Sequence, residues 1–157
     1  MQHKLILHDI RSAHNVGSIF RTADGAGVAC IYLTGYTPRP VDRFGRAQPE
    51  IAKTALGAEQ VVPYEAADDV NDIIRRLRAA GTTVVAVEQA PSSIALPDFT
   101  PPERVAYILG NEVTGLPAGV LAAADAIVEI PMYGKKESLN VAVTAGLVCY
   151  THLRRSE

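Results

Sequence analysis

Two short stretches of the chain combine residue types that could bind and orient a polar ligand. In HNVGSIFRTAD (residues 14–24), Asn15 precedes Arg21 by six positions, which is less than two helical turns. In ILGNEVTGLP (residues 108–117), Glu112 lies two positions after the glycine that ends an apolar run. Ligands of α/β domains gather outside the carboxyl ends of the strands, so a carboxylate at such a strand end is a candidate site residue. The structural alternative is a turn with a solvated glutamate.

A third stretch, IPMYGKKESLNVAVTAG (residues 130–146), places Ser138 and Asn140 at the start of an apolar run with a helical pattern. The free N–H groups at the start of a helix suit an anionic or carbonyl-rich ligand. Together the three stretches offer a guanidinium, a carboxylate, amides and a hydroxyl.

The sequence lacks the usual motifs of dinucleotide binding, phosphate binding, nucleophilic catalysis and metal binding. No G-x-G-x-x-G follows the first apolar run, and the chain has no P-loop and no serine in a nucleophile elbow. Cys30 and Cys149 lie far apart within apolar stretches, which favours buried free thiols over a disulfide. The four histidines lack metal-ligand spacing, so no metal site is predicted: His3, His8, His14 and His152.

In order and spacing, the three stretches resemble the three motifs of the SPOUT superfamily of RNA methyltransferases, in its SpoU/TrmH branch. The resemblance extends from Leu5 to about Leu153. It implies an α/β fold whose C-terminal part is threaded into a trefoil knot, a homodimer, and S-adenosylmethionine bound in the knot. The implied reaction is methyl transfer to a ribose 2′-hydroxyl of RNA, without a metal.

The resemblance also implies roles for single residues. Arg21 would orient the ribose and stabilise the developing alkoxide, because an arginine stays protonated and is a poor base. The proton would pass to an RNA phosphate, to Glu112 or to water. Glu112 would hold Asn15 or Arg21 in place, and Asn15 could also cap the first helix. Ser138 and Asn140 complete the catalytic set. The structural alternative for Arg21 is a buried ion pair with Glu112.

Two further sets of residues are expected at the site. The cofactor pocket would be formed by Val87, Glu88, Gly110, Ile130, Met132, Ser138 and Leu139, with Gly110 and Gly115 allowing close approach of the backbone. RNA would contact a basic rim made of Arg11, Arg39, Arg43, Arg46, Lys135 and Lys136, extended by Arg154 and Arg155 at the C-terminal end. The loops that carry these charges also have a simpler interpretation, as solvated surface.

Six apolar runs are expected to form strands, at residues 4–10, 29–36, 60–64, 82–89, 104–110 and 126–131. Helical patterns occupy residues 15–27, 68–81 and 138–155, and the longest loops are residues 34–50 and 88–103. Strands that alternate with helices predict a mostly parallel six-stranded sheet with helices on both faces. We expect residues 1–157 to form one domain.

The predicted C-terminal helix is apolar nearly all round. Leu139, Val143, Leu147 and Tyr150 fall on one side, while Val141, Ala145 and Val148 make the other side apolar. A helix of this kind is buried all round, and a second copy of the chain would supply the missing cover. Dimerisation through this helix is therefore expected, and a Val148→Glu substitution is expected to weaken it. The alternative is a helix that lies in a groove of the monomer.

Composition narrows the class of protein further. The net charge is −2, the sequence pI is about 6.1, and no apolar run approaches the roughly 20 residues that cross a bilayer. The N-terminus lacks a signal-peptide pattern, so we expect a cytoplasmic protein without a membrane anchor. By analogy with small stand-alone members of the family that it resembles, the protein is expected to modify tRNA, which leaves rRNA open. The alternatives are methylation of a base nitrogen and a non-catalytic module that binds cofactor and RNA.

Overall fold

A parallel β-sheet forms the centre of residues 2–151 and 153, the part of the chain that this computed structural model describes. Its seven strands are β1 (Gln2–His8), β2 (Ile31–Thr34), β3 (Tyr64–Ala67), β4 (Thr83–Val87), β5 (Ile94–Ala95), β6 (Arg104–Leu109) and β7 (Ala126–Glu129). They lie in the order β3-β2-β1-β6-β4-β7-β5, and every pairing is parallel. The expectation of an α/β fold built on a parallel sheet is confirmed.

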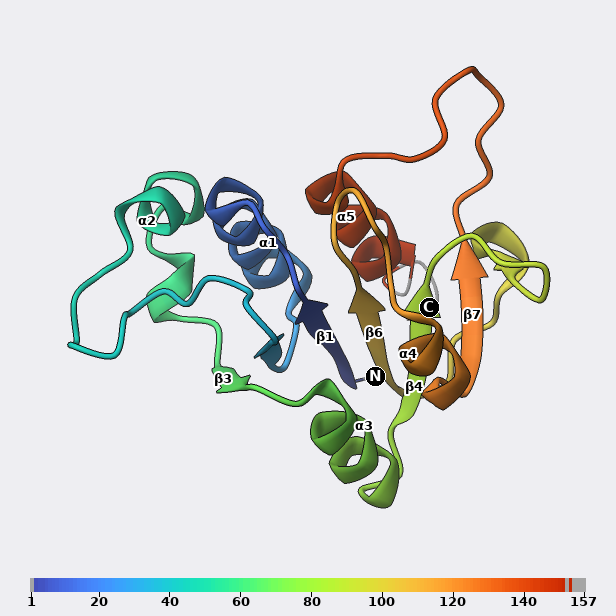
Figure 1. The fold of residues 1–157 in the computed structure, drawn as a ribbon, viewed down its shortest axis with the longest axis horizontal. Coiled ribbons are helices and arrows are strands. Elements are labelled where there is room, and N and C mark those ends of the chain that lie inside the picture. The colour runs from blue at the N-terminus through green and yellow to red at the C-terminus, as the bar shows by residue number, and fades with distance from the viewer. Residues whose placement is uncertain (1, 152, 154–157) are drawn as a thin grey trace.

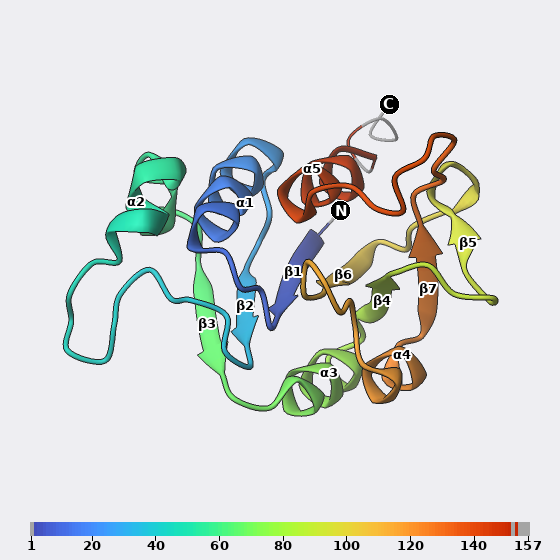
Figure 2. The same cartoon turned by 45° about the horizontal axis from the view of Figure 1, so that its top comes forward.

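Helices cover both faces of this sheet (Figures 1 and 2). They are α1 (Ala13–Ala26), α2 (Pro49–Ala55), α3 (Val70–Ala79), α4 (Ala118–Ala123) and α5 (Val141–Thr151), with single 3₁₀ turns at Ala58–Gln60 and Leu96–Asp98. Helices α1, α2 and α5 pack on one face, and α3 and α4 pack on the other (Figure 2).

The two central strands are buried on both sides, which explains why their sequences are continuously apolar. In β1, Leu5 and Leu7 belong to the core under α1 and α5, and Ile6 belongs to the core above α3 and α4. Their neighbour β6 alternates in the same way, with Tyr107 on the first side and Ile108, which pairs with Ile6, on the second.

The chain leaves β1 and β6 towards opposite faces of the sheet. The segment after β1 enters α1, whereas the segment after β6 leads to α4. Between two such neighbouring strands an open parallel sheet leaves a crevice at the carboxyl ends, where ligands bind. Asn15 and Glu112 follow these two strand ends, so the fold brings two of the predicted motifs together.

Several elements differ from the sequence-based expectation. The seventh strand, β5, has only two residues, too few to give a periodic pattern. The strand expected at residues 60–64 is wrong except at Tyr64, because residues 58–60 form a 3₁₀ turn. The short helices α2 and α4 were not predicted. The last helix begins at Val141 and not at residue 138.

The two sides of α5 have different surroundings. Val141, Ala145 and Val148 are buried against the sheet and α1, whereas Val143 and Leu147 are exposed. A Val148→Glu substitution would place a charge in the core of the single chain, so Val148 is not a residue with which to test a dimer contact. Within the described residues, no helix is long and apolar enough to cross a membrane.

The cysteines are free thiols, as expected, although Cys30 is only half-buried. Burial raises the pKa of the Cys149 thiol to about 12, and it also raises the pKa of Cys30. Both groups are therefore poor nucleophiles at neutral pH.

Gly17 is required where α1 packs against α2. A methyl group added at this glycine would collide with the backbone oxygen of Ile51 and with the hydroxyl of Thr54. We expect Gly17→Ala to destabilise the protein by about 1 to 3 kcal/mol in urea unfolding, because overpacking outweighs the better helix propensity of alanine. The control is Gly119→Ala in α4, where an added methyl group meets open space. Equal stability of the two variants would contradict this account of the α1–α2 contact.

Candidate active site

A cavity lies beyond the carboxyl ends of β4, β6 and β7, where the segment that leads into α5 closes it. All seven residues expected in a cofactor pocket line this cavity: Val87, Glu88, Gly110, Ile130, Met132, Ser138 and Leu139. Its walls combine aliphatic side chains with the carboxylates of Glu88, Glu112 and Glu129. A ligand that fits must therefore have an apolar part and groups that carry positive charge or donate hydrogen bonds.

The turn between β6 and α4 forms one wall of the cavity. Gly115 has a φ of 68°, and a side chain there would collide with the carboxylate of Glu88. That carboxylate accepts hydrogen bonds from the N–H groups of Leu116 (3.1 Å) and Gln89 (2.9 Å). A Cβ on Gly110 would lie 2.8 Å from the side chain of Leu116. The packing of the turn itself thus requires both glycines.

Glu112 extends from the same turn to the start of α1. Its Oε2 accepts the N–H of Arg11 (3.0 Å), and its Oε1 accepts the N–H of Ser12 (3.2 Å) and the side-chain amide of Asn15 (3.3 Å). Partial burial tends to raise the pKa of Glu112, but hydrogen bonds from the Arg11, Glu112 and Ser12 backbone and from Asn15 outweigh it and lower the pKa. Glu112 is therefore a carboxylate at neutral pH, and its position at a helix N-terminus favours that charge.

Asn15 connects Glu112 to the start of α5 through hydrogen bonds. Its Nδ2 donates to Glu112, and its Oδ1 accepts a hydrogen bond from Nδ2 of Asn140 at 3.2 Å. The Oδ1 of Asn140 in turn accepts the N–H of Ala142 at 2.8 Å, which caps α5. An ionised carboxylate can only accept, so it fixes the orientation of both amides along this line. We call the hydrogen-bonded series Glu112, Asn15 and Asn140 the amide relay.

Asn15 does not cap its own helix. The cap of α1 is Ser12, whose hydroxyl accepts the N–H of Asn15 at 3.1 Å. The expectation that Asn15 serves as the cap is wrong, since its side chain is engaged with Glu112 and Asn140. Serine at the position before a helix is a strong N-cap signal, so Ser12 could have been identified from the sequence.

Arg21 is not part of the cavity wall. It is exposed on α1 and lines a second hollow with Ser18, Thr22, Thr54 and Tyr150, between α1, α2 and α5. It forms no ion pair or hydrogen bond with any other residue in the described part of the chain. The structure therefore does not contain the ion pair between Arg21 and Glu112 that was considered as an alternative.

The six described residues of the predicted basic rim are of two kinds. Arg39 and Arg46 already pair with Asp68 and Asp42, and the guanidinium of Arg43 lies 4.8 Å from the centre of the Phe44 ring. The others are the exposed Arg11, Lys135 and Lys136, whose side chains have no charged partner among residues 2–151 and 153. Arg154 and Arg155 lie outside the described residues.

The cavity also contains polar residues that were not predicted, namely Gln89, Asn111, Glu129 and Thr144. The rule that sites gather at strand ends could have identified Gln89 and Asn111, because Gln89 is the last residue of one predicted strand and Asn111 directly follows another. Thr144 carries no such signal, since only the folding of α5 over the cavity brings it there. No group of histidine, cysteine, aspartate and glutamate side chains suited to a metal ion occurs in the described residues.

An open parallel sheet with a cavity at the carboxyl ends of its strands is typical of α/β proteins that bind small molecules there. Residues 2–150 match the SpoU rRNA Methylase family, and the chain therefore belongs to that family.

Two curated relatives have similar sequences. The 23S rRNA (guanosine-2′-O-)-methyltransferase RlmB of Neisseria meningitidis is 33% identical over 144 residues, which are 92% of this chain and 55% of the relative. The tRNA (guanosine(18)-2′-O)-methyltransferase of Borreliella burgdorferi is 31% identical over 150 residues, which are 96% of this chain and 65% of the relative. The chain thus spans just over half to about two thirds of the length of these relatives.

Two solved structures show the same fold. The AdoMet-bound rRNA methyltransferase from Sinorhizobium meliloti superimposes with a TM-score of 0.89 at 32% identity, covering 99% of this chain and 57% of that one. A structure described as giving insights into the 2-OH methylation of C/U34 on tRNA has a TM-score of 0.82 at 28% identity, covering 98% and 95% of the two chains.

Replacing Glu112 with glutamine tests whether its charge holds the site together. We expect Glu112→Gln to lower the free energy of unfolding at pH 7 by on the order of 1 kcal/mol, because the amide cannot accept all three hydrogen bonds equally well. A lowered pKa means that the stabilisation is present above the ordinary value of 4.5 and is lost as the pH falls through the lowered pKa. Urea unfolding at several pH values should show the two proteins converging in acid.

The matched control for this measurement is Glu129→Gln, a second cavity carboxylate whose side chain has no hydrogen bond to another described residue. Its effect should be small at every pH. A difference between wild type and Glu112→Gln that stays constant from neutral pH into acid would refute the charged role of Glu112.

Proposed function

We propose that the protein is an S-adenosylmethionine-dependent RNA methyltransferase that modifies a ribose 2′-hydroxyl. The observation that carries this proposal is the amide relay, which joins the three motif segments at the edge of one cavity. Membership of the SpoU family and the similarity to guanosine-2′-O-methyltransferases support the reaction type.

The cavity has the chemical character that S-adenosylmethionine requires. Leu109, Ile130 and Leu139 offer apolar contacts for an adenine ring, and nearby carboxylates suit hydroxyl groups and positive charge. Glu129 is the cavity carboxylate whose side chain accepts no hydrogen bond from another described residue. When bound, this cofactor supplies a methyl group on a positively charged sulfur.

The chain's own residues would position the hydroxyl for an in-line displacement. In that reaction the ribose oxygen forms a bond to the methyl carbon while the carbon–sulfur bond breaks, and the hydroxyl loses its proton. Holding the two reactants in line can lower the barrier by on the order of 7 to 11 kcal/mol. We propose that Asn15 and Asn140, whose amides are fixed by the relay, border the place where the ribose lies, with Ser138 beside them.

Glu112 is poorly suited to accept the proton. Its pKa is lowered and both of its oxygens already accept hydrogen bonds, so it is a weak base. We propose that an RNA phosphate or water takes the proton and that Glu112 keeps Asn15 in its orientation.

Arg21 is proposed to act on the RNA from the second hollow. Its guanidinium lies with the hydroxyl-bearing residues Ser18 and Thr54, a combination that suits a phosphate or a developing alkoxide. This hollow also contains Tyr150 of α5, next to the exposed apolar side of that helix. The nucleotide that Arg21 reaches therefore depends on how two copies of the chain pair.

We propose a homodimer through the exposed side of α5, together with a C-terminal trefoil knot and a cytoplasmic location. The dimer is supported by the apolar stripe of Leu139, Val143, Leu147 and Tyr150, which the single chain leaves exposed. The knot rests on the family resemblance, and the location follows the sequence-based expectation given above.

As substrate we propose tRNA rather than rRNA. The proposal is supported by the structure described for methylation on tRNA, which has a TM-score of 0.82 with this chain, and by the 31% identical tRNA (guanosine(18)-2′-O)-methyltransferase. Arg11, Lys135 and Lys136, free of charged partners among the described residues, are the first candidates for phosphate contacts, followed by Arg39, Arg43 and Arg46.

Incubation with labelled S-adenosylmethionine and separate tRNA and rRNA fractions tests the reaction and the substrate together. We expect nuclease digestion and mass spectrometry to find a 2′-O-methylated nucleoside in the tRNA fraction. A base-methylated nucleoside would establish the alternative chemistry. Cofactor binding by calorimetry without any transfer would point to a non-catalytic module.

Removing the guanidinium tests the role of Arg21. We expect Arg21→Ala to lower kcat by about 10²- to 10³-fold, the cost of losing one donor to a developing oxyanion, while the Kd for cofactor stays unchanged. Single-turnover transfer and calorimetry measure the two quantities. Arg21→Lys keeps the charge but loses the planar set of donors, so its kcat should lie between those of wild type and Arg21→Ala. Wild-type turnover by Arg21→Ala would remove this residue from the mechanism.

A charge on the exposed side of α5 tests the dimer. Leu147→Glu should halve the mass measured by light scattering, because it buries a carboxylate in the proposed interface. The control, Asn71→Glu, lies on α3 at the opposite face of the sheet and should leave the mass unchanged. A Leu147→Glu protein with the wild-type mass would refute an interface through α5.

A further inference from the structure

Tyr36 is an aromatic residue held at both ends while its ring stays open to solvent. It follows β2, and 61% of its surface is exposed. Its N–H donates to Oδ1 of Asp9 (3.1 Å), and its hydroxyl oxygen accepts a hydrogen bond from Nδ2 of Asn111 (2.8 Å). The ring is therefore fixed in place by polar contacts and not by burial in the core.

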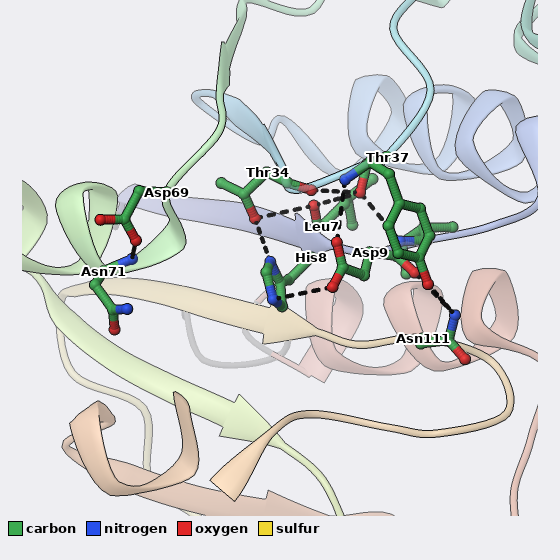
Figure 3. Close-up of polar contacts among 10 residues, drawn as sticks. Leu7, His8, Asp9, Thr34, Thr37, Asp69, Asn71 and Asn111 are labelled. Atoms are coloured by element: carbon green, nitrogen blue, oxygen red, sulfur yellow. Dashed lines mark hydrogen bonds and ion pairs between the residues drawn. The ribbon is translucent and has the colours of Figure 1, made fainter. Parts of the chain in front are cut away.

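Asp9, which holds the backbone of Tyr36, has an unusual conformation. Its φ is 54°, a left-handed value that residues other than glycine rarely adopt. The surrounding contacts maintain it. The Asp9 N–H donates to the Thr34 carbonyl (3.2 Å), its carboxylate lies 3.4 Å from Nε2 of His8, and its carbonyl accepts the Asn111 amide at 3.0 Å (Figure 3). Backbone strain that the surroundings sustain in this way clusters at functional sites.

Asn111 connects Tyr36 directly to the cavity. Its Oδ1 accepts the N–H groups of Val113 (2.8 Å) and Thr114 (2.9 Å), which shapes the turn, and its Nδ2 donates to Asp9 and Tyr36. All the hydrogen-bonding capacity of this amide is used, so its orientation is fixed. Since Asn111 lines the cavity, the Tyr36 ring lies one hydrogen bond away from the cavity wall.

We propose that the exposed ring of Tyr36 is the platform on which the base of the target nucleotide stacks. This inference rests on the proposed function, because it assigns a place to the base of the nucleotide whose ribose is methylated. Proteins that act on a single nucleotide of RNA hold its base unstacked from its neighbours, against an aromatic side chain. A rigid ring beside the cavity receives the base while the attached ribose reaches the methyl donor.

Phe44, the other exposed aromatic residue of residues 34–50, is less suited to this task. The guanidinium groups of Arg43 and Arg46 lie 4.8 and 5.0 Å from the centre of its ring, so cations of the chain itself already occupy positions over it. Tyr36 has no such contact within the described residues.

The test compares Tyr36→Leu, which removes the aromatic ring, with Tyr36→Phe, which keeps it and removes only the hydroxyl. RNA binding is measured by filter retention with bulk tRNA and with bulk rRNA, and cofactor binding by calorimetry. We expect Tyr36→Leu to weaken binding of the substrate RNA by roughly 5- to 150-fold, the range measured for loss of one stacked base. Tyr36→Phe keeps the ring but loses one of the hydrogen bonds that hold it, so its loss of RNA binding should be clearly smaller than that of Tyr36→Leu, and both variants should bind cofactor normally.

Ultraviolet crosslinking gives an independent measurement on the unmodified protein. Irradiation of wild type with bulk tRNA, followed by digestion and mass spectrometry, should place a nucleotide adduct on the peptide that contains Tyr36. RNA binding by Tyr36→Leu equal to that of wild type, or an equal loss in Tyr36→Phe, would overturn the platform.

The platform and the proposed reaction can fail separately. Methyl transfer that does not depend on the ring at position 36 would overturn the platform and leave the reaction standing. RNA binding that depends on this ring, without methyl transfer by wild type, would support the platform and count against the reaction.

Discussion

The carboxylate of Glu112 is the constraint on which the rest of the site depends. It accepts hydrogen bonds from the first N–H groups of α1 and from Asn15, and through Asn15 it orients Asn140 at the start of α5. One ionised group thereby joins three segments that lie about 100 and 125 positions apart in the chain. Because a carboxylate can only accept, the direction of every hydrogen bond along this line follows from its charge.

The sheet topology places this carboxylate where it can act. Strands β1 and β6 are neighbours, but their chains continue to opposite faces, so the space beyond their ends stays open. The turn after β6 fills part of that space, and its glycines let it pack against Glu88 without a side chain in between. The cavity itself lies beyond the carboxyl ends of β4, β6 and β7, and its polarity comes from the residues at those strand ends.

The structure separates the motif residues into two groups. Glu112, Asn15 and Asn140 form one connected network, and the seven expected pocket residues surround the adjoining cavity. Arg21 faces a different hollow, beside the exposed side of α5. A single chain therefore holds a prearranged pocket, but the guanidinium of Arg21 lies outside that pocket. The homodimer proposed above would cover the apolar residues exposed on α5, next to the hollow that contains Arg21.

The sequence by itself determined the α/β class, five of the seven strands in outline and the identity of most residues around the cavity. Apolar runs and glycine-bounded turns are local signals, and the three motifs are short and contiguous. Only the tertiary structure decided that Ser12 and not Asn15 caps α1, that Arg21 does not pair with Glu112, and which side of α5 is buried. The same holds for Asn111 and Tyr36, whose contact joins segments 75 positions apart. These features depend on contacts between distant segments, and periodicity along the chain carries no information about such contacts.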